Sequence, residues 1–156
     1  MGQQVIDERR WQILFMRWPV HWTGRWMTWR HPNYAHVLLI SPIGNGQWLG
    51  VDWGVKGLFV RPLGSVAVAK LLLYASEVLE YDQFEAAAPD VIGRSILPQT
   101  CMTMARQAMG LPSSWAFWRS GWALRCELLE RGARVVMPPK PEVPFDEFRR
   151  WWRRRQ

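Results

Sequence analysis

Cys101 is the residue of this chain that is best placed to do chemistry. Thr100 precedes it as a helix cap, and Gly110 closes the helix that the pattern predicts over residues 100–109. A thiol in the first turn of a helix meets unpaired backbone N–H groups and the positive end of the helix dipole, and both lower its pKa. The same N–H groups would stabilise the oxyanion of a tetrahedral intermediate. These features make Cys101 a candidate nucleophile.

A nucleophilic thiol needs a base, and a predicted β-hairpin upstream of Cys101 offers one. Residues 36–40 and 47–53 are rich in strand-forming side chains and flank the turn-forming residues 42–46. His36 begins the first of these strands, and Asp52 lies near the end of the second. We therefore expect His36 to accept the proton of the thiol and Asp52 to orient the imidazole.

The number of residues in the hairpin loop decides whether His36 and Asp52 can meet. An odd loop between the strands places the two side chains on one face, directly opposite or one step diagonal, whereas an even loop places them on opposite faces. The sequence favours a three-residue loop that ends with Asn45 or Gly46 in the left-handed conformation. The site therefore depends on one residue of register.

Other residues offer alternatives to this assignment. His21 and His31 lie in a Trp-rich and Arg-rich segment, and either would serve as the base if the strands were shifted. Cys126 falls in a predicted helix over Gly121–Arg131 and is expected to be a packing residue, a role that is also the plain alternative for Cys101. The three histidines and two cysteines lack the close pairing of zinc ligands, so no metal or cofactor is expected.

The remaining patterns predict an α+β fold, with a small antiparallel sheet packed with helices. Further strands are expected at Trp11–Met16, Gly57–Arg61, Glu77–Phe84 and Arg134–Met137, further helices at Thr23–Arg30 and Ser65–Tyr74, and a connection at Ala86–Pro98.

Composition separates the body of the chain from its end. With 49% hydrophobic residues and 12 tryptophans among 156 residues, the chain can bury a substantial aromatic core. Four of these tryptophans follow one another at helical spacing, namely Trp18, Trp22, Trp26 and Trp29. They are expected to pack in the core or against another subunit, and a sugar-stacking or lipid-facing surface is the alternative. Five arginines after residue 148 supply most of the net charge of +7, and their removal leaves about +2. The basicity therefore belongs to the tail.

The order of these features predicts three segments. Residues 1–137 form the domain, residues 138–144 form a stiff Pro-rich linker, and residues 145–156 form a basic aromatic tail. Phe145, Phe148, Trp151 and Trp152 are spaced to share one face of a helix in the tail. The tail is a candidate for binding an acidic protein partner, nucleic acid or an anionic lipid surface.

The first residues of the sequence and its apolar runs bear on the cellular compartment of the protein. No apolar run approaches the roughly 20 residues of a membrane span, and the first residues lack the pattern of a signal peptide. The sequence therefore predicts synthesis and folding in the cytoplasm.

The order of strand with His, strand with Asp and then helix with Cys resembles the permuted branch of the NlpC-type papain-like superfamily, which includes lecithin retinol acyltransferase. It is most similar to small phage-encoded proteins of that type, over about residues 11–131. The matching pieces are Trp11–Met16, Ala35–Leu39, Val51–Asp52, Thr100–Gly110 and Trp115–Leu129. Many relatives have Asn where this chain has Thr100, which puts the hydrogen bonding to substrate in question.

This resemblance implies a cysteine hydrolase or acyltransferase that acts on an amide bond of peptidoglycan, with an ester or thioester as further substrate classes. It also implies a phage-encoded protein with a virion-associated location. Cys101, His36 and Asp52 would be its catalytic residues. The alternative is a non-catalytic structural or assembly protein of a virion that uses the same fold. Such a protein would dock through its Trp-rich surface and the Arg-Trp tail.

Overall fold

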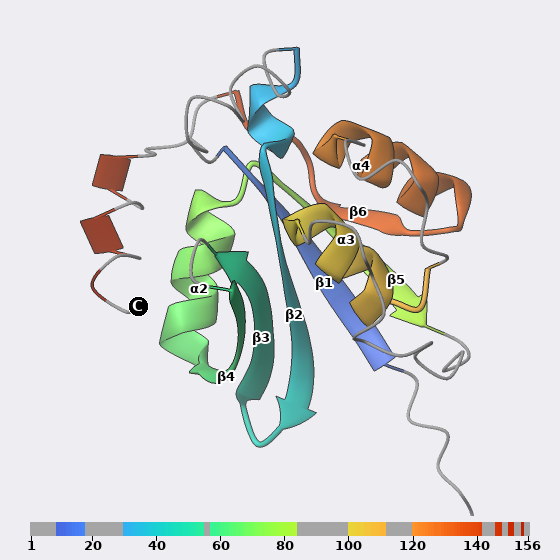
Figure 1. Cartoon of the computed structure of the whole chain (residues 1–156). Coiled ribbons are helices and arrows are strands. Elements are labelled where there is room, and N and C mark those ends of the chain that lie inside the picture. The colour runs from blue at the N-terminus through green and yellow to red at the C-terminus, as the bar shows by residue number, and fades with distance from the viewer. Residues whose placement is uncertain are drawn as a thin grey trace, which may run out of the picture.

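The computed structural model shows an α+β fold, as the sequence predicts. It describes residues 9–17, 30–54, 57–83, 100–111, 120–141, 146–147, 150–151 and 154. Within these ranges lie a six-stranded antiparallel sheet, three α-helices and one 3₁₀ turn (Figure 1). The strands are β1 (Arg9–Met16), β2 (His36–Gly44), β3 (Gln47–Gly54), β4 (Gly57–Gly64), β5 (Glu77–Gln83) and β6 (Arg134–Met137). The helices are η1 (Pro32–Tyr34), α2 (Ser65–Tyr74), α3 (Cys101–Ala108) and α4 (Gly121–Glu130).

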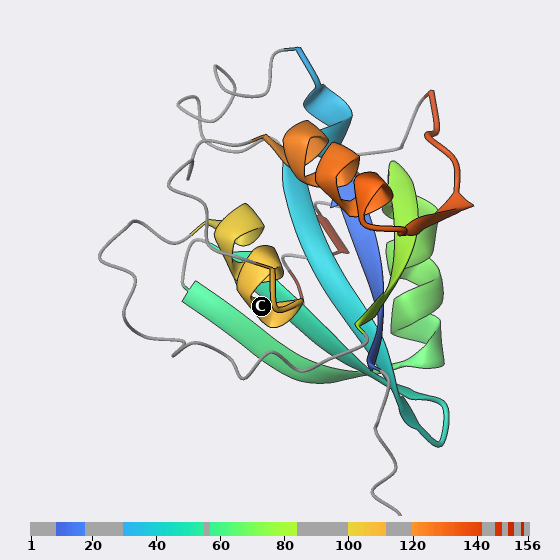
Figure 2. The ribbon, with the colours of Figure 1, turned by 90° about the vertical axis from the view of Figure 1, so that its right-hand side faces the viewer.

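The strands lie in the order β4-β3-β2-β1-β5-β6, so β1 and β2 form the centre of the sheet. Alternation along β1 sends Ile13 and Phe15 to one face and Leu14 and Met16 to the other, and all four are buried. The first face packs against α3 and α4, whereas the second packs against α2. Figures 1 and 2 show this three-layer arrangement, with α2 on one side of the sheet and α3 and α4 on the other.

The turn between β2 and β3 corrects the loop length that the sequence favours. The connection has two residues, Asn45 and Gly46, and both have positive φ (52° and 70°), as a type I′ hairpin turn requires. A two-residue turn alone would place His36 and Asp52 on opposite faces. The pairing, however, shifts by one residue at a bulge between Pro42 and Gly44. The bulge adds the one extra residue that the prediction placed in the loop, so His36 and Asp52 lie on the same face.

Strands β2 and β3 pair over only part of their lengths. The register runs from Gly44↔Gln47 to Leu39↔Val51, whereas β1 remains paired with β2 as far as His36 and β4 remains paired with β3 as far as Gly54. The first three residues of β2 therefore have a neighbouring strand on one side only. Figure 1 shows the two strands separating away from their turn. Helix α3 contacts both strands.

Helix α4 packs closely against the segment that leads into β2. A Cβ atom at Gly121 would overlap the carbonyl oxygen of Tyr34 and lie 3.0 Å from the terminal methyl of Met102. Farther along, Arg106 of α3 forms a bidentate ion pair with Glu127 of α4, with Nη2 3.0 Å from Oε1. Glycine at position 121 and this ion pair hold α4 against η1 and α3.

The segment after β6 contacts α2. The Lys140 ammonium donates to the carbonyl oxygens of Leu72 and Leu73 at 3.0 and 2.9 Å, near the C-terminus of α2. Trp151 is 8% exposed and belongs to the apolar cluster on that side of the sheet. The division into linker and tail stays a prediction, but both segments contact the domain.

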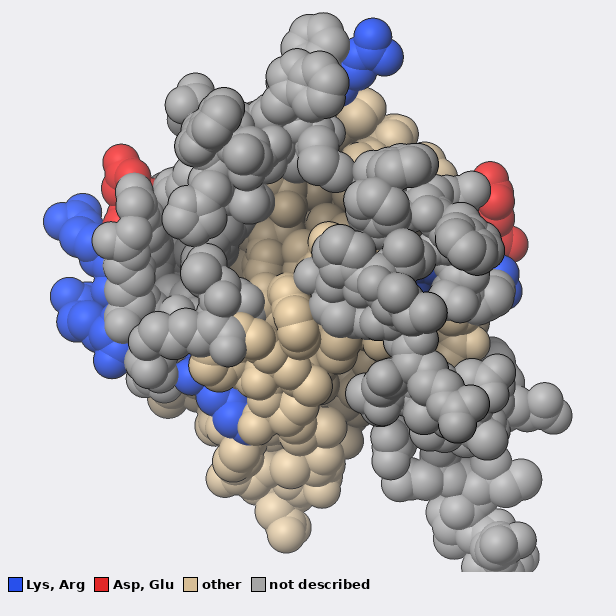
Figure 3. All heavy atoms as spheres, viewed as in Figure 1, with Lys and Arg blue, Asp and Glu red and all other residues tan. Residues whose placement is uncertain are grey.

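The exposed Arg150 and Arg154 lie in the predicted tail. Basic side chains gather on the left side of the molecule in Figure 3, where the tail lies in Figure 1.

Several sequence-based expectations fall outside the described residues. These are the helix over Thr23–Arg30 except Arg30, the tryptophan series at 18, 22, 26 and 29, the connection over Ala86–Pro98, and the aromatic residues Phe145, Phe148 and Trp152 of the tail. The expected strands and the helices at Ser65–Tyr74, Thr100–Met109 and Gly121–Arg131 are confirmed to within three residues at each end, except that β2 continues through the bulge to Gly44.

Replacing Gly121 with serine tests the close contact between α4 and η1. We expect Gly121→Ser to lower the free energy of unfolding by about 1–3 kcal/mol, because the new side chain must displace the Tyr34 carbonyl. Chemical denaturation measures this. Gly64→Ser is the matched control, since a side chain there meets open space and serine is a favourable N-cap for α2. Equal losses for the two variants would contradict the packing described.

Candidate functional site

Helix α3 places Cys101 at its first residue. Thr100 has extended backbone angles and caps the helix: its hydroxyl accepts from the Thr103 N–H at 3.3 Å, and its own N–H donates to the Thr103 hydroxyl at 2.7 Å. This reciprocal cap fixes the start of the helix. Cys101 therefore lies among the first-turn N–H groups, where the helix dipole favours a thiolate.

The register of β2 and β3 brings His36 and Asp52 together. Continued past the last pair, the register sets Asp52 opposite Leu38, so Asp52 and His36 are diagonal neighbours on one face. The imidazole Nε2 lies 2.7 Å from Asp52 Oδ1, and each residue is 6% exposed. The two side chains thus form a buried hydrogen bond between the strands.

Cys101 reaches this pair where β2 and β3 separate. His36 alternates with Val37 along β2 and so lies on the α2 side of the sheet, whereas α3 packs on the other side. The thiol nevertheless forms hydrogen bonds with the His36 side chain and with the Val37 backbone N–H. The opening between β2 and β3 allows the thiol, which is on α3, to contact both the His36 side chain and the Val37 amide.

The charge of Asp52 determines the protonation of His36. Burial alone would lower the pKa of the imidazole, but the negative charges of Asp52 and the Cys101 thiolate, with the hydrogen bonds from both, raise the pKa of His36 from 6.5 to about 10. At neutral pH, His36 is therefore an imidazolium.

The protonated His36 in turn favours the thiolate. Burial would raise the pKa of Cys101, and the charge of Asp52 adds to that effect. The positive charge of His36, the hydrogen bond from its ring and the hydrogen bond from the Val37 N–H outweigh both, so the pKa of Cys101 lies below its ordinary value. The three side chains form a thiolate–imidazolium–carboxylate chain, a charge arrangement suited to nucleophilic catalysis.

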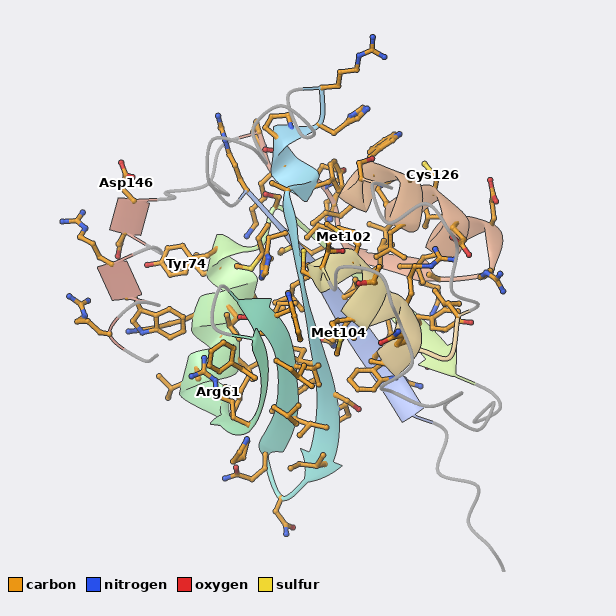
Figure 4. All side chains as sticks on the ribbon, in the orientation of Figure 1. Arg61, Tyr74, Met102, Met104, Cys126 and Asp146 are labelled. Carbon is orange, nitrogen blue, oxygen red and sulfur yellow. The ribbon has the colours of Figure 1, made fainter. Side chains whose placement is uncertain are left out.

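The other candidate residues lie elsewhere or outside the described ranges. His31 directly precedes η1, with no side-chain capping bond, and stacks on the Trp122 ring with centroids 4.7 Å apart. His21 is outside the described residues. Cys126 is half-buried, and its side chain projects from the upper edge of α4 in Figure 4. Among the residues that the structure describes, no group of three or more His, Cys, Asp or Glu side chains is arranged to hold a metal ion.

The sequence did not indicate one contributor to the site, the Val37 backbone N–H. An amide is present at every position except proline, so no residue type marks it. Its role follows from the separation of β2 and β3, which leaves the start of β2 facing α3.

Comparison with protein-family models, curated proteins and solved structures gave no match to this chain. No helix in the described ranges is long and apolar enough to cross a membrane.

The pH dependence of alkylation tests the ion pair. The thiolate forms above the lowered pKa of Cys101, and its imidazolium partner persists until about pH 10, so alkylation by iodoacetamide should begin well below the ordinary thiol pKa of about 8.5 and reach a plateau. Mass spectrometry of the Cys101 peptide measures the rate, with Cys126 in the same sample for comparison. A Cys101 rate that rises only above pH 8.5 would contradict the ion pair.

Replacing Asp52 with asparagine tests the carboxylate. We expect Asp52→Asn to lower the pKa of His36 by at least about one unit, because the variant loses the negative charge that favours the imidazolium. The alkylation plateau should end at a correspondingly lower pH. NMR titration of the imidazole measures the pKa directly. Asp82→Asn is the matched control, because Asp82 pairs with Arg10 and Arg134 at the surface. An unchanged His36 titration in Asp52→Asn would exclude the role assigned to Asp52.

Proposed function

We propose that this protein is a cysteine hydrolase or acyltransferase in which Cys101 is the nucleophile, His36 is the acid and base, and Asp52 orients His36. The observation that carries the proposal is the hydrogen-bonded chain from the Cys101 thiol through His36 to Asp52. Structural packing does not require a buried histidine to bind a thiol with one nitrogen and a carboxylate with the other. A burial cost offset by such a chain is typical of catalytic sites.

The hydrogen bonds assign the proton transfers to particular atoms. Nε2 of His36 is bound to Asp52, so Nδ1 is the nitrogen that exchanges a proton with the thiol and the substrate. The Cys101 thiolate attacks the carbonyl carbon, and the carbonyl π electrons move to oxygen. First-turn N–H groups of α3 are placed to stabilise that oxyanion. Nδ1–H then protonates the leaving amine, and a thioester remains on Cys101.

The second half of the reaction regenerates the site. Neutral His36 removes a proton from water, or from an acceptor alcohol or amine, as that nucleophile attacks the thioester. Collapse of the intermediate releases the acid or the transferred acyl product and restores the thiolate–imidazolium pair. Asp52 stays hydrogen-bonded to Nε2 throughout and keeps the ring in one orientation. The same residues therefore serve hydrolysis and acyl transfer, and the attacking nucleophile distinguishes them.

The substrate we propose is an amide bond of peptidoglycan, in a phage-encoded and virion-associated setting. This proposal rests on the resemblance to the permuted papain-like proteins. It is supported by an antiparallel sheet in which the His strand and the acid strand precede the Cys helix. The second candidate, an assembly protein that docks through residues 145–156, is supported by the exposed Arg150 and Arg154. The burial of Trp151 removes one of the aromatic side chains expected to contact a partner.

An activated ester tests the chemistry without assuming the natural substrate. p-Nitrophenyl acetate should acetylate Cys101, as a burst of nitrophenol and an acetylated Cys101 peptide in mass spectrometry. Cys101→Ala should abolish the adduct and lower turnover by about 10³-fold or more, as should His36→Ala, whereas Cys126→Ala should retain both. Release of amino groups from purified peptidoglycan then tests the substrate. A folded protein whose Cys101 reacts no faster than Cys126 would exclude the enzyme and favour the assembly role.

A further inference from the structure

The position of His36 at the start of β2 raises the question of what holds it in place. Only β1 pairs with this part of the strand, through Met16↔His36, because pairing with β3 begins at Leu39. A strand end paired on one side is more mobile than a central strand. The imidazole, however, must stay within hydrogen-bond distance of groups on two other elements, β3 and α3. Its orientation therefore needs further support from the residues that precede it.

The preceding turn, η1, provides that support through Tyr34. The Tyr34 side chain is buried and lies edge-on to Phe15 of β1, with ring centroids 5.4 Å apart. Its hydroxyl forms hydrogen bonds with Glu77 of β5 and Arg125 of α4, and burial together with Glu77 raises the pKa of Tyr34 to about 12. Tyr34 is thus a hydrogen-bond donor at every pH at which the proposed site works.

Glu77 and Arg125 form a rigid receptor for this hydroxyl. Glu77 is fully buried, and Arg125 binds it through two bonds, with Nε–Oε2 2.6 Å and Nη2–Oε1 2.8 Å. The guanidinium also lies 4.8 Å from the centroid of the Trp122 ring, on which His31 stacks. A bidentate Arg–carboxylate pair fixes both partners in direction as well as distance. We call Tyr34, Glu77 and Arg125 the Tyr34 anchor.

The backbone of Tyr34 is held as well. Its N–H donates to the His31 carbonyl at 3.0 Å, and its carbonyl oxygen lies against Gly121 at the start of α4. Only Ala35 separates Tyr34 from His36, so a shift of η1 must move the first residue of β2. The anchor thus connects the position of the imidazole to β5 and α4, two elements that do not contribute a side chain to the proposed site.

We propose that Tyr34 is a positioning residue for the site, whose hydroxyl bond to the Glu77–Arg125 pair keeps the His36 imidazole between Asp52 and Cys101. The inference rests on the proposed thiol chemistry, in which His36 must contact both partners at once. Among the described residues, the charged groups that interact with the Tyr34 side chain are Glu77 on β5 and Arg125 on α4, and the titratable His31 lies at the start of the same turn. None of them contributes to the chain from Cys101 to Asp52.

Removal of the Tyr34 hydroxyl tests the proposal. Tyr34→Phe retains the aromatic contacts and loses only the bonds to Glu77 and Arg125. Tyr74→Phe is a matched control, because Tyr74 is also buried and bonded to a carboxylate, Glu147, but lies on the opposite side of the sheet. Figure 4 shows Tyr74 pointing from α2 toward the C-terminal segment. Each variant removes one buried tyrosine hydroxyl that is bonded to a carboxylate, so a difference between them reports on location.

Three readouts separate positioning from stability. We expect Tyr34→Phe to slow acetylation of Cys101 on the order of tenfold, less than the ~10²-fold that a full 1 Å misplacement can cause. The alkylation midpoint of Cys101 should move to higher pH, and the NMR signal of the His36 ring proton bound to Asp52 should broaden or shift. All three should stay at wild-type values in Tyr74→Phe. Unfolding free energies for both variants show how much stability each has lost.

The outcomes distinguish this inference from the proposed function. Wild-type readouts in Tyr34→Phe, or equal changes in the two variants, would overturn the positioning role. An unreactive Cys101 in the wild-type protein would instead overturn the proposed function, and the His36 signal would still report whether Tyr34 orients the ring. Glu77→Gln is a second variant: it should change the His36 signal in the same direction as Tyr34→Phe, and an unchanged signal in a folded Glu77→Gln protein would count against the anchor.

Discussion

The hydrogen bond between His36 and Asp52 is the interaction on which the site depends. Both groups are buried, and transfer of either charge from water alone would cost several kcal/mol. The imidazolium of His36 persists because Asp52 and the Cys101 thiolate both stabilise its positive charge. The three side chains together carry one net negative charge. The Val37 N–H and the first-turn N–H groups of α3 lie where they compensate it.

This chain of charges requires that three elements meet at one point, and the sheet provides the geometry. The bulge between Pro42 and Gly44 places Asp52 on the same face as His36. Removal of the extra residue would reverse the faces of one strand relative to the other and separate the carboxylate from the imidazole. The separation of β2 and β3 beyond Leu39 then admits the thiol from the far side of the sheet. A continuous sheet would keep Cys101 and His36 apart.

The same separation leaves the start of β2 weakly supported, and the surrounding structure compensates for this. Two bidentate Arg–Glu pairs, Arg125–Glu77 and Arg106–Glu127, connect α4 to β5 and to α3. Gly121 lets α4 approach the backbone of η1. Helix α4 therefore contacts the segments that carry both His36 and Cys101, although it supplies no group to the chain itself.

Local sequence determined much of this protein. Alternating and continuous apolar runs predicted the strands, and the pattern from Thr100 to Gly110 predicted a capped helix with Cys101 in its first turn. These features follow from contacts within a few residues, for which the amino-acid types are sufficient. Residue types also identified Cys101 and His36 as candidates, because the chain has only two cysteines and three histidines. Asp52 was identified by its place in the predicted hairpin with His36.

Only the tertiary structure decided whether those candidates meet. The extra residue that shifts the register lies in a bulge at Ile43 and not in the turn, because Asn45-Gly46 suits a two-residue type I′ turn. No residue type in the sequence marks this bulge. The Val37 N–H and the Tyr34 anchor were equally hidden, since a backbone amide and a tyrosine carry no sign of their partners. Cys101 and His36 are 65 positions apart in the sequence, and their contact depends on how α3 packs at the opening of the sheet, which no local pattern records.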